Sequence, residues 1–352
     1  MQYKTFGRRS GLRVSEVALG TGNFGTGWGH GAERDEARSM FDGYLAAGGN
    51  FIDTADGYQG GQAEVMLADF IAPERARLVV ASKFSLGAAG DASVATTGNS
   101  RKTMMQSVEA SLKRLGTDYL DVLWVHFPDA HTPMEEILRG LDDLVRSGKI
   151  LYAGLSNFPA WRVARADAIA GLRGWAPLIG LQMEYSLAER SAEREALPML
   201  DALGLGGALW SPLGGGLLTG KYRNNEEGRL QGLNGFLTRT EKSARERNTV
   251  DAVLAVAAEL DAPATQVAIA WLLQRGAAAQ TTLVPILGPR SRAQLDGTLG
   301  ALTLKLTPEQ YARLDAASAI ALGAPYEVNA QTAPRIAGGA PELLQPARLP
   351  VA

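Results

Sequence analysis

Short apolar segments alternate with longer amphipathic segments along most of this chain of 352 residues. Eight of the apolar segments are four to seven residues long and rich in Val, Ile and Leu, as is typical of strands buried on both faces. We therefore predict strands at residues 17–20, 50–53, 78–83, 120–126, 152–155, 179–183, 207–210 and 283–287.

The segments between these strands predict helices. Residues 103–115 place Met104, Val108 and Leu112 on one face, and residues 133–146 form a second segment of this kind. Strands that alternate with helices favour a parallel sheet. Eight such units over about 300 residues predict an α/β fold in which the sheet closes into a (β/α)8 TIM barrel.

Three segments fall outside this repeat. Residues 1–16 predict an N-terminal β-hairpin that closes the floor of the barrel. Residues 222–240 are polar and rich in Gly and Asn, which predicts a long mobile loop. In residues 319–352, Ala, Pro and Gly dominate without a clear period, so we expect extended C-terminal loops that form an irregular lid or are partly disordered. We expect one domain over residues 1–352, with the barrel at approximately residues 15–318.

Composition narrows the possible partners. The formal net charge of −2 gives no electrostatic reason to expect a nucleic acid or an anionic membrane. Cysteine is absent, and only His30, His126 and His131 could supply imidazole, so we expect no disulfide and no metal site. The N-terminus lacks a signal-peptide pattern, and no run approaches the ~18 apolar residues of a membrane span. We therefore expect a cytoplasmic protein without a membrane partner.

Four polar residues lie at or just beyond the ends of three consecutive strands: Asp53, Tyr58, Lys83 and His126. A strand that ends in a charged group places that group at the mouth of the sheet, where α/β barrels keep their chemistry. A phenol with a pKa near ~10 is a weak acid at neutral pH, but an adjacent ammonium favours the phenolate, and a carboxylate keeps that ammonium charged. An imidazole beside them could orient a substrate oxygen.

Each of these residues has an ordinary structural alternative. Asp53 could cap a helix, Lys83 could lie on the surface, and Tyr58 and His126 could be packing residues. The apolar neighbours of Lys83 argue against a surface position. The occurrence of all four at successive strand ends on one rim favours a catalytic group.

A glycine motif suggests a different fold. Residues 20–25 match G-x-G-x-x-G directly after a strand, and Asp53 closes the next strand, as in a Rossmann dinucleotide-binding domain. The last glycine does not open a helix, however, because residues 26–31 prolong the loop, and a pyrophosphate cradle requires a helix N-terminus at once. That architecture also leaves the polar ends of the later strands unexplained, so we favour the barrel.

Several segments resemble the aldo-keto reductase superfamily, over residues 1–318. The segment DTADGY at 53–58 resembles the family's DTAxxY motif, ASKF at 81–84 and LWVH at 123–126 resemble its lysine and histidine strand ends, and GLSNF at 154–158 and QMEYSL at 182–187 are similarly close. The resemblance is to bacterial-type members, which are related to the β-subunits of potassium channels. It implies that Tyr58 is the general acid, that Lys83 and Asp53 tune it, and that His126 orients the carbonyl.

The resemblance also implies an NADPH/NADP+ cofactor, since no side chain carries a hydride. Ser156, Asn157 and Gln182 would then hold the carboxamide of the nicotinamide, and Trp210 would stack on its ring. The glycines of residues 211–221 allow close approach of a pyrophosphate, although this segment could be a plain flexible loop. The further residues expected to bind the cofactor are Gly22, Asn23, Ser211, Leu213, Gly215, Lys221, Gly288, Arg290 and Gln294.

Residues 288–295 open a helix, and its N-terminus together with Arg290 suits a phosphate. The resemblance makes this group the adenosine 2′-phosphate and predicts a preference for NADPH over NADH. The chain departs from the family at Gly297 and Thr298, where an acidic residue and Asn are common, so the usual adenine contact is in question. Ala63 also replaces the usual Ser before Glu64.

The predicted partner is a small carbonyl or alcohol. The expected reaction is reduction of an aldehyde or ketone, reversible when NADP+ is abundant. Phe24, Trp28 and Phe127 are candidates to line the substrate pocket, and Tyr222 and Tyr326 are further candidates. An alternative is a nicotinamide-sensing regulatory β-subunit of a channel or another partner, because fold alone does not fix function. The sequence leaves the oligomeric state and the physiological substrate open.

Overall fold

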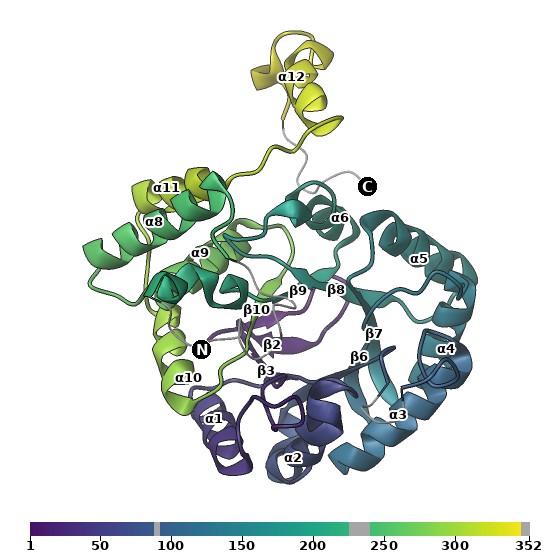
Figure 1. Cartoon of the computed structure of the whole chain (residues 1–352). Helices are drawn as coiled ribbons and strands as arrows, with labels where there is room; N and C mark the ends of the chain where they lie inside the picture. Colours follow the sequence, from purple (N-terminus) through teal and green to yellow (C-terminus); the bar gives the residue numbers. More distant parts are fainter. Residues whose placement is uncertain (88–91, 225–239, 346–352) are drawn as a thin grey trace.

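Eight parallel strands form a closed barrel at the centre of the molecule (Figure 1). The computed structural model describes residues 1–87, 92–224 and 240–345. The barrel strands follow one another around the ring in chain order, and β10 closes it against β3. They are β3 (Ala18–Gly20), β4 (Phe51–Asp53), β5 (Val79–Phe84), β6 (Leu120–Val125), β7 (Ile150–Ser156), β8 (Leu178–Glu184), β9 (Gly206–Trp210) and β10 (Leu283–Leu287).

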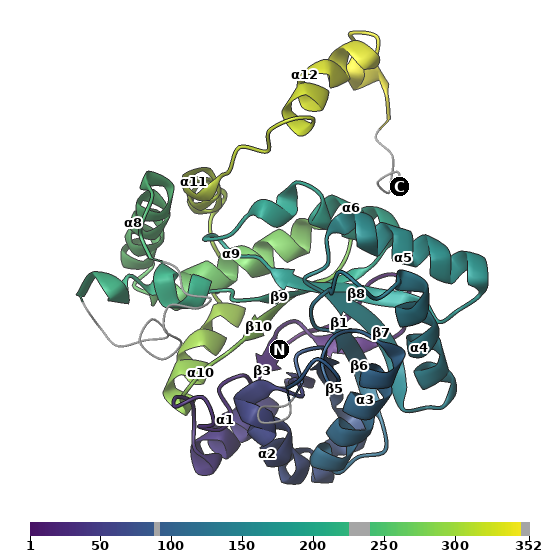
Figure 2. The same ribbon diagram turned by 45° about the vertical axis from the view of Figure 1, so that its right-hand side comes forward.

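Helices surround this ring on the outside, as Figure 2 shows from a second direction. The helices between successive strands are α1 (Arg34–Ala46), α2 (Gln62–Ile71), α3 (Arg101–Leu115), α4 (Met134–Arg146), α5 (Ala160–Arg173), α6 (Ala196–Leu203), α8 (Ala244–Glu259) and α9 (Ala264–Ala278). After β10 come α10 (Arg292–Leu299), α11 (Pro308–Ser318) and α12 (Tyr326–Ile336). All eight predicted strands are confirmed, as is the (β/α)8 class, and the closed ring excludes the Rossmann alternative.

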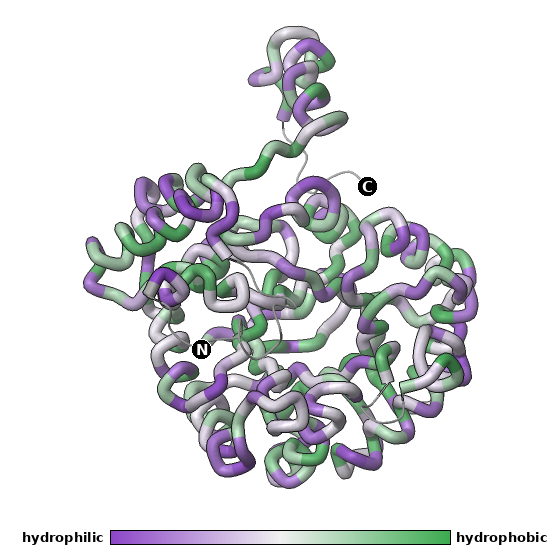
Figure 3. Tube along the Cα trace, viewed as in Figure 1, coloured by the Kyte–Doolittle hydropathy of each residue, from purple (hydrophilic) through white to green (hydrophobic). Residues whose placement is uncertain are grey.

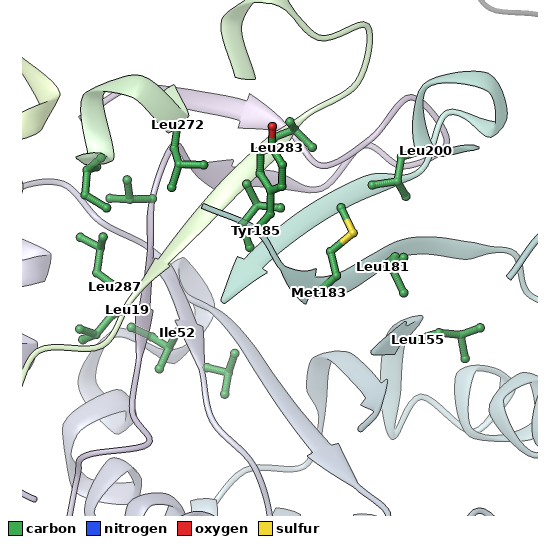
Figure 4. Packing of buried hydrophobic residues seen from close by; sticks show 14 of the residues in the cluster. Leu19, Ile52, Leu155, Leu181, Met183, Tyr185, Leu200, Leu272, Leu283 and Leu287 are labelled. Carbon is green, nitrogen blue, oxygen red and sulfur yellow. The ribbon is translucent and has the colours of Figure 1, made fainter. Parts of the chain in front are cut away.

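The core has two layers, one on each side of the barrel wall. Figure 3 shows hydrophobic segments in the strands and mixed segments along the outer helices. The outer layer fills the space between strands and helices, and Figure 4 labels residues of this layer from the strands, such as Leu19, Ile52 and Leu181, together with Leu272 of α9. A smaller inner layer fills the barrel itself. Because both faces of each strand are covered, the strand sequences are almost continuously apolar.

The N-terminal hairpin supplies the floor of the barrel, as predicted. Strands β1 (Tyr3–Thr5) and β2 (Arg13–Ser15) pair antiparallel, and the turn between them carries Phe6 into the inner core. The Phe6 ring meets the rings of Phe51 and Trp124 edge-on, with centroids 5.9 and 6.1 Å apart. A Cβ at Gly180 would lie 2.6 Å from Phe6, so this strand position has no room for a side chain.

The C-terminal segment differs from the expectation of irregular structure. Residues 326–336 form helix α12, which has no buried residue. Figures 1 and 2 both show it projecting away from the barrel rather than over its mouth. The Tyr326 hydroxyl donates to Glu195 Oε1 at 2.7 Å, and Tyr326 is not a lining residue of the pocket described below. None of its side chains is buried, so the helix lacks the core-facing side from which helices are usually predicted.

Two further expectations, a long loop at residues 222–240 and the lack of a membrane span, can be compared only with the residues that the structure describes. Most of the loop expected at 222–240 lies outside them, and its first residues belong to the 3₁₀ turn η5 (Lys221–Asn224). Within the described ranges, no single helix is both long enough and apolar enough to cross a membrane, whereas α8 and α9, bent by 101° at their junction, meet that criterion only as a pair.

Candidate active site

The parallel register brings the four predicted polar residues to one rim. Asp53 ends β4 opposite Ala81 of β5, and Lys83 lies two residues further along β5. His126 directly follows β6, and Tyr58 opens the 3₁₀ turn η1 (Tyr58–Gly61) after β4. Because all barrel strands run in one direction, the carboxyl ends of β4, β5 and β6 meet at the same end of the barrel.

Lys83 connects the carboxylate to the phenol. Its side chain is buried, and its Nζ donates to Asp53 Oδ2 at 2.6 Å and to the Tyr58 hydroxyl oxygen at 2.9 Å. A third bond goes to the carbonyl oxygen of Thr54 at 2.7 Å. Burial alone would lower the pKa of Lys83, but the charge of Asp53 and the contact with Tyr58 outweigh it, and the net pKa is raised. The ammonium therefore stays charged beside the phenol.

Gln182 holds the second oxygen of the Asp53 carboxylate from the opposite side of the barrel. Its Nε2 donates to Asp53 Oδ1 at 2.8 Å, so both carboxylate oxygens are engaged. Gln182 belongs to β8, four strands from β4, so this bond crosses the mouth of the barrel. An ion pair this deeply buried requires such additional hydrogen bonds to offset the loss of hydration.

His126 lies next to the phenol in surroundings that favour its neutral form. Burial, reinforced by the charge of Lys83, lowers the pKa of His126 well below its usual value. Its ring centroid lies 5.9 Å from that of Tyr58, edge to face. Within the described residues, its buried Nδ1 has no hydrogen-bond partner. A neutral imidazole can donate one N–H to a substrate oxygen without adding charge.

A cavity of about 1560 Å³ opens over this group. Asp53, Tyr58 and His126 line it, whereas Lys83 lies behind Tyr58. The predicted cofactor residues that also line it are Gly22, Asn23, Asn157, Gln182, Trp210, Ser211, Leu213, Gly215, Lys221, Gly288, Arg290 and Gln294. Trp28 and Phe127, predicted for the substrate, lie on the same wall as Tyr58: the ring centroids of Trp28 and Tyr58 are 6.1 Å apart.

The amide of Asn157 has an unusual local geometry. Its φ is 60°, a conformation that side-chain-bearing residues rarely adopt, and Ser211 has a φ of 52°. Asn157 Nδ2 donates to the carbonyl oxygen of His126 at 2.9 Å, and Trp210 Nε1 donates to Asn157 Oδ1 at 3.0 Å. Strained backbone of this kind concentrates at ligand sites. The bond between Trp210 and Asn157 sets the indole at the edge of the cavity.

Two groups at the far end of the cavity suit phosphates. Gly215 and Gly216, with φ of 67° and 97°, form a tight turn against which the side chains of Lys221 and Tyr222 lie, and the Tyr222 hydroxyl donates to the carbonyl oxygen of Gly215 at 2.7 Å. Ser291 caps α10, accepting from the N–H of Gln294, and Arg290 lies just before the cap. Within the described part of the chain, no hydrogen bond or ion pair is found for the Arg290 guanidinium, whereas its backbone N–H donates to Gln294 Oε1 at 2.9 Å.

Four of the predicted pocket and cofactor residues do not line the cavity: Tyr326, Tyr222, whose hydroxyl donates to the carbonyl oxygen of Gly215 at 2.7 Å, Phe24 and Ser156. Phe24 is fully buried in the outer core, edge-on to Phe70 with ring centroids 6.5 Å apart, and does not line the cavity. Ser156 is also fully buried, and its Oγ accepts from Asn157 Nδ2 at 3.0 Å. Side chains alternate across the end of β7, so Asn157 faces the cavity and Ser156 does not.

Other lining residues were not predicted. His30 and Leu86 lie near Trp28 and Tyr58, and Thr219, Arg223, Leu254 and Thr265 lie toward the other end. Leu86 could have been predicted from the sequence, because it is an apolar residue that follows the strand end carrying Lys83. Leu254 lies within α8, and the others come from loops, short turns and a helix start, which have no period. Among the described residues, no cluster of three or more His, Cys, Asp or Glu could hold a metal ion.

Comparison with known proteins places this site in a family. The model described as "Aldo/keto reductase family" matches residues 16–319. The chain therefore belongs to the aldo/keto reductase family, as the DTADGY and strand-end motifs predicted.

Relatives in other organisms cover most of the chain. It is 36% identical over 325 residues to norsolorinic acid reductase of Aspergillus flavus, covering 90% of this chain and 81% of the relative. It is 36% identical over 337 residues to aryl-alcohol dehydrogenase [NADP(+)] of Phanerodontia chrysosporium, covering 90% and 86%. An uncharacterized oxidoreductase of Bacillus subtilis, YrpG, is 36% identical over 322 residues, covering 88% and 93%. The family and these relatives support an oxidoreductase that acts on carbonyl groups.

Proposed function

We propose that this protein is an NADPH-dependent reductase of aldehydes and ketones in which Tyr58 is the general acid. The observation that carries the proposal is the position of Lys83, whose ammonium contacts Asp53 on one side and the Tyr58 oxygen on the other. A buried cation that keeps a phenol oriented into a cavity has the arrangement that proton transfer to a substrate oxygen requires. The relative from Phanerodontia, named for NADP(+), supports the cofactor.

The described residues fit a dinucleotide of this type. Gly22 leaves the face of Tyr58 open, because a Cβ there would already lie 3.8 Å from the ring. Asn157 and Gln182 present amides, the turn at Gly215 lines the cavity beside Lys221, and Arg290 offers a cation before a helix N-terminus. When bound, NADPH would supply the hydride, and Arg290 would hold the 2′-phosphate.

The chain's own residues would then handle the proton and the orientation. His126, kept neutral by burial, donates a hydrogen bond to the carbonyl oxygen and fixes its direction. Tyr58 gives its proton to the same oxygen as negative charge develops there. Lys83 stabilises the phenolate that remains, and Asp53 keeps the lysine charged and aimed. In the reverse direction, the phenolate accepts the proton of an alcohol.

The mouth of the cavity suits an aromatic or bulky apolar carbonyl. Trp28, Leu86 and Phe127 are partly exposed apolar residues that line the wall around Tyr58. The rings of His126 and Phe127 lie 4.7 Å apart with a 30° tilt, which extends a flat aromatic surface outward from the catalytic group. The names of the relatives, an aryl-alcohol dehydrogenase and a norsolorinic acid reductase, support a substrate of this class.

The test is the loss of NADPH absorbance with aromatic aldehydes, aryl ketones, α-dicarbonyls and sugar aldehydes. We expect turnover on aromatic members, and we expect Tyr58→Phe to lose about 10²–10⁴-fold in kcat while still binding NADPH. Tyr326→Phe is the matched control, because its hydroxyl bonds Glu195 away from the cavity. An unchanged rate in Tyr58→Phe would refute the mechanism. NADPH binding without turnover on any member would favour the sensing role.

A further inference from the structure

A second buried carboxyl belongs to a residue whose backbone bonds that of the catalytic lysine. Asp56 is in the turn between β4 and Tyr58, and its backbone N–H donates to the carbonyl oxygen of Lys83 at 3.1 Å. Its side chain is only 1% exposed, and it is not among the residues that line the cavity. Within the described residues, neither carboxyl oxygen has a hydrogen-bond partner. A buried acid without such partners is costly, which makes a functional reason worth seeking.

The charges around Asp56 come from three elements. Glu64 of α2 is fully buried, and its carboxylate accepts from Ser82 Oγ at 2.6 Å and from Arg114 Nε of α3 at 2.7 Å. Lys83 of β5 is the third charged neighbour. Glu64 and Arg114 are therefore paired with each other, and they leave Asp56 as the acid of the group that lacks a dedicated cation.

This environment favours the neutral form of the carboxyl. Burial raises the pKa of Asp56 to about 7, and the negative charge of Glu64 adds to the rise. The positive charges of Arg114 and Lys83 oppose this rise, as does the backbone N–H of Gly57, which lies near the carboxyl without the geometry of a hydrogen bond. The charge of the ionised form would act on the ammonium of Lys83 without contacting it, because charges in a poorly hydrated interior interact strongly.

We propose that Asp56 is a positioning residue that sets the strength of Tyr58 as an acid by acting through Lys83. The proposal rests on the proposed reductase function. When Asp56 is neutral, Tyr58 feels the full charge of the ammonium, which favours its phenolate and makes it a stronger acid. When Asp56 is ionised, its charge partly offsets that of Lys83, and Tyr58 gives up its proton less readily. Reduction should therefore slow as Asp56 ionises.

Two isosteric variants test this in opposite ways. Asp56→Asn keeps the shape of the side chain and holds it in a neutral form at every pH. Glu64→Gln keeps both of its contacts, because the amide oxygen accepts from Arg114 and the amide N–H donates to Ser82 Oγ, but it removes a negative charge beside Asp56. The measurement is the single-turnover rate of NADPH oxidation against pH, with saturating cofactor and the best substrate of the panel.

In the natural protein, we expect the rate to fall by about two- to tenfold through neutral pH, ahead of the loss caused by ionisation of Tyr58 itself. In Asp56→Asn the neutral step should vanish, and the Tyr58 step should move to lower pH. In Glu64→Gln the neutral step should remain and move to lower pH, since Asp56 then ionises more easily. Asp69→Asn, which alters an exposed acid paired with Arg34 on the same helix as Glu64, should change neither step.

A second measurement does not depend on turnover. The absorbance of tyrosinate is titrated in the natural protein and in Asp56→Asn, each minus its own Tyr58→Phe version. We expect the phenolate of Tyr58 to form at lower pH in Asp56→Asn. An identical titration, or an Asp56→Asn rate profile that is lowered equally at every pH, would overturn the proposal. Failure of every carbonyl substrate would count against the reductase function alone, because the titration would still report on Asp56.

Discussion

Two buried cations of this barrel, Lys83 and Arg190, show how similar burial serves different ends. Lys83 lies at the mouth and Arg190 lies in the loop after β8, and both are almost inaccessible. The Arg190 guanidinium donates to both oxygens of Glu193, at 2.7 and 3.0 Å, and to the backbone carbonyl oxygen of Asp315 in α11 at 2.9 Å, and it forms an ion pair with the Asp315 carboxylate. Every one of these partners is structural, and together they fasten α11 to the barrel.

Lys83 differs in the last of its three bonds. Two go to Asp53 and to the Thr54 carbonyl, which hold it in place, and the third goes to the Tyr58 phenol, whose ring faces the cavity. A buried ion pair is thus weak evidence of chemistry by itself. The difference lies in a partner that can exchange a proton with something outside the protein.

The largest effect should follow from removing the proton-tuning cation. Lys83→Met leaves Asp53 without its ion pair and Tyr58 without an adjacent positive charge. We expect kcat to fall by about 10²–10⁴-fold in the protein that remains folded. Stopped-flow kinetics on samples checked by circular dichroism would measure it. A rate within tenfold of the natural protein would contradict the proposed role of the lysine.

The matching change in the structural cluster should act on stability alone. Arg190→Met leaves Glu193 and Asp315 without their shared cation. We expect the free energy of unfolding to fall by about 3–5 kcal/mol, as for other broken buried pairs, with kcat of the folded protein unchanged. Urea unfolding followed by fluorescence gives the first value. A large loss of kcat without loss of stability would erase the contrast between the two cations.

Unlike the two cations, Asp56 makes the free energy of unfolding depend on pH around neutrality. Its folded-state pKa of about 7 lies above the ordinary value of an unfolded aspartate, so the folded state retains a proton that the unfolded state has lost. This contribution is fully present below about pH 4 and disappears as pH rises through about 7. Relative to Asp56→Asn, the natural protein should lose about 3 kcal/mol between pH 5 and pH 8. Thermal or urea unfolding of both proteins at the two pH values would check this.

The smallest of these effects concerns the phosphate end, where a cation faces the cavity without an ionic partner among the described residues. Arg290→Ala should weaken NADPH binding by about 10–50-fold, as expected for the loss of a charge-assisted contact, and should change NADH binding by less than about threefold. Fluorescence titration with both cofactors measures the difference. Equal losses for the two would remove the assignment of the 2′-phosphate.

The sequence predicted the parts of the site that the barrel itself positions. Asp53, Lys83 and His126 lie at strand ends, and the alternation of strands and helices fixes which ends share a rim. Trp28 and Phe24 show the limit of this reasoning. Both are aromatic residues of one glycine-rich loop, but the bridge between Phe24 and Ala32 turns Phe24 into the core. A loop has no period from which that turn could be read.

Asp56 shows a second limit of prediction from the sequence. It stands inside the segment DTADGY that carried the family resemblance, yet nothing in that segment marks its carboxyl as different from that of Asp53. Its surroundings depend on Glu64 and Arg114, which lie eight and 58 residues further along the chain and meet it only when α2 and α3 pack together. The pKa of a buried group is a property of tertiary structure.

Phe6 closes one end of the barrel, so the barrel is open at one end only. Its ring, together with Phe51 and Trp124, seals the end opposite to the reaction. In the proposed mechanism, each cycle of reduction would consume the proton of Tyr58, and its replacement would come from bulk solvent. With the floor sealed, that proton can enter only by the path that the substrate takes. Reprotonation of Tyr58 and exchange of substrate and product would thus use the same opening of the cavity, and a tightly bound product would delay both.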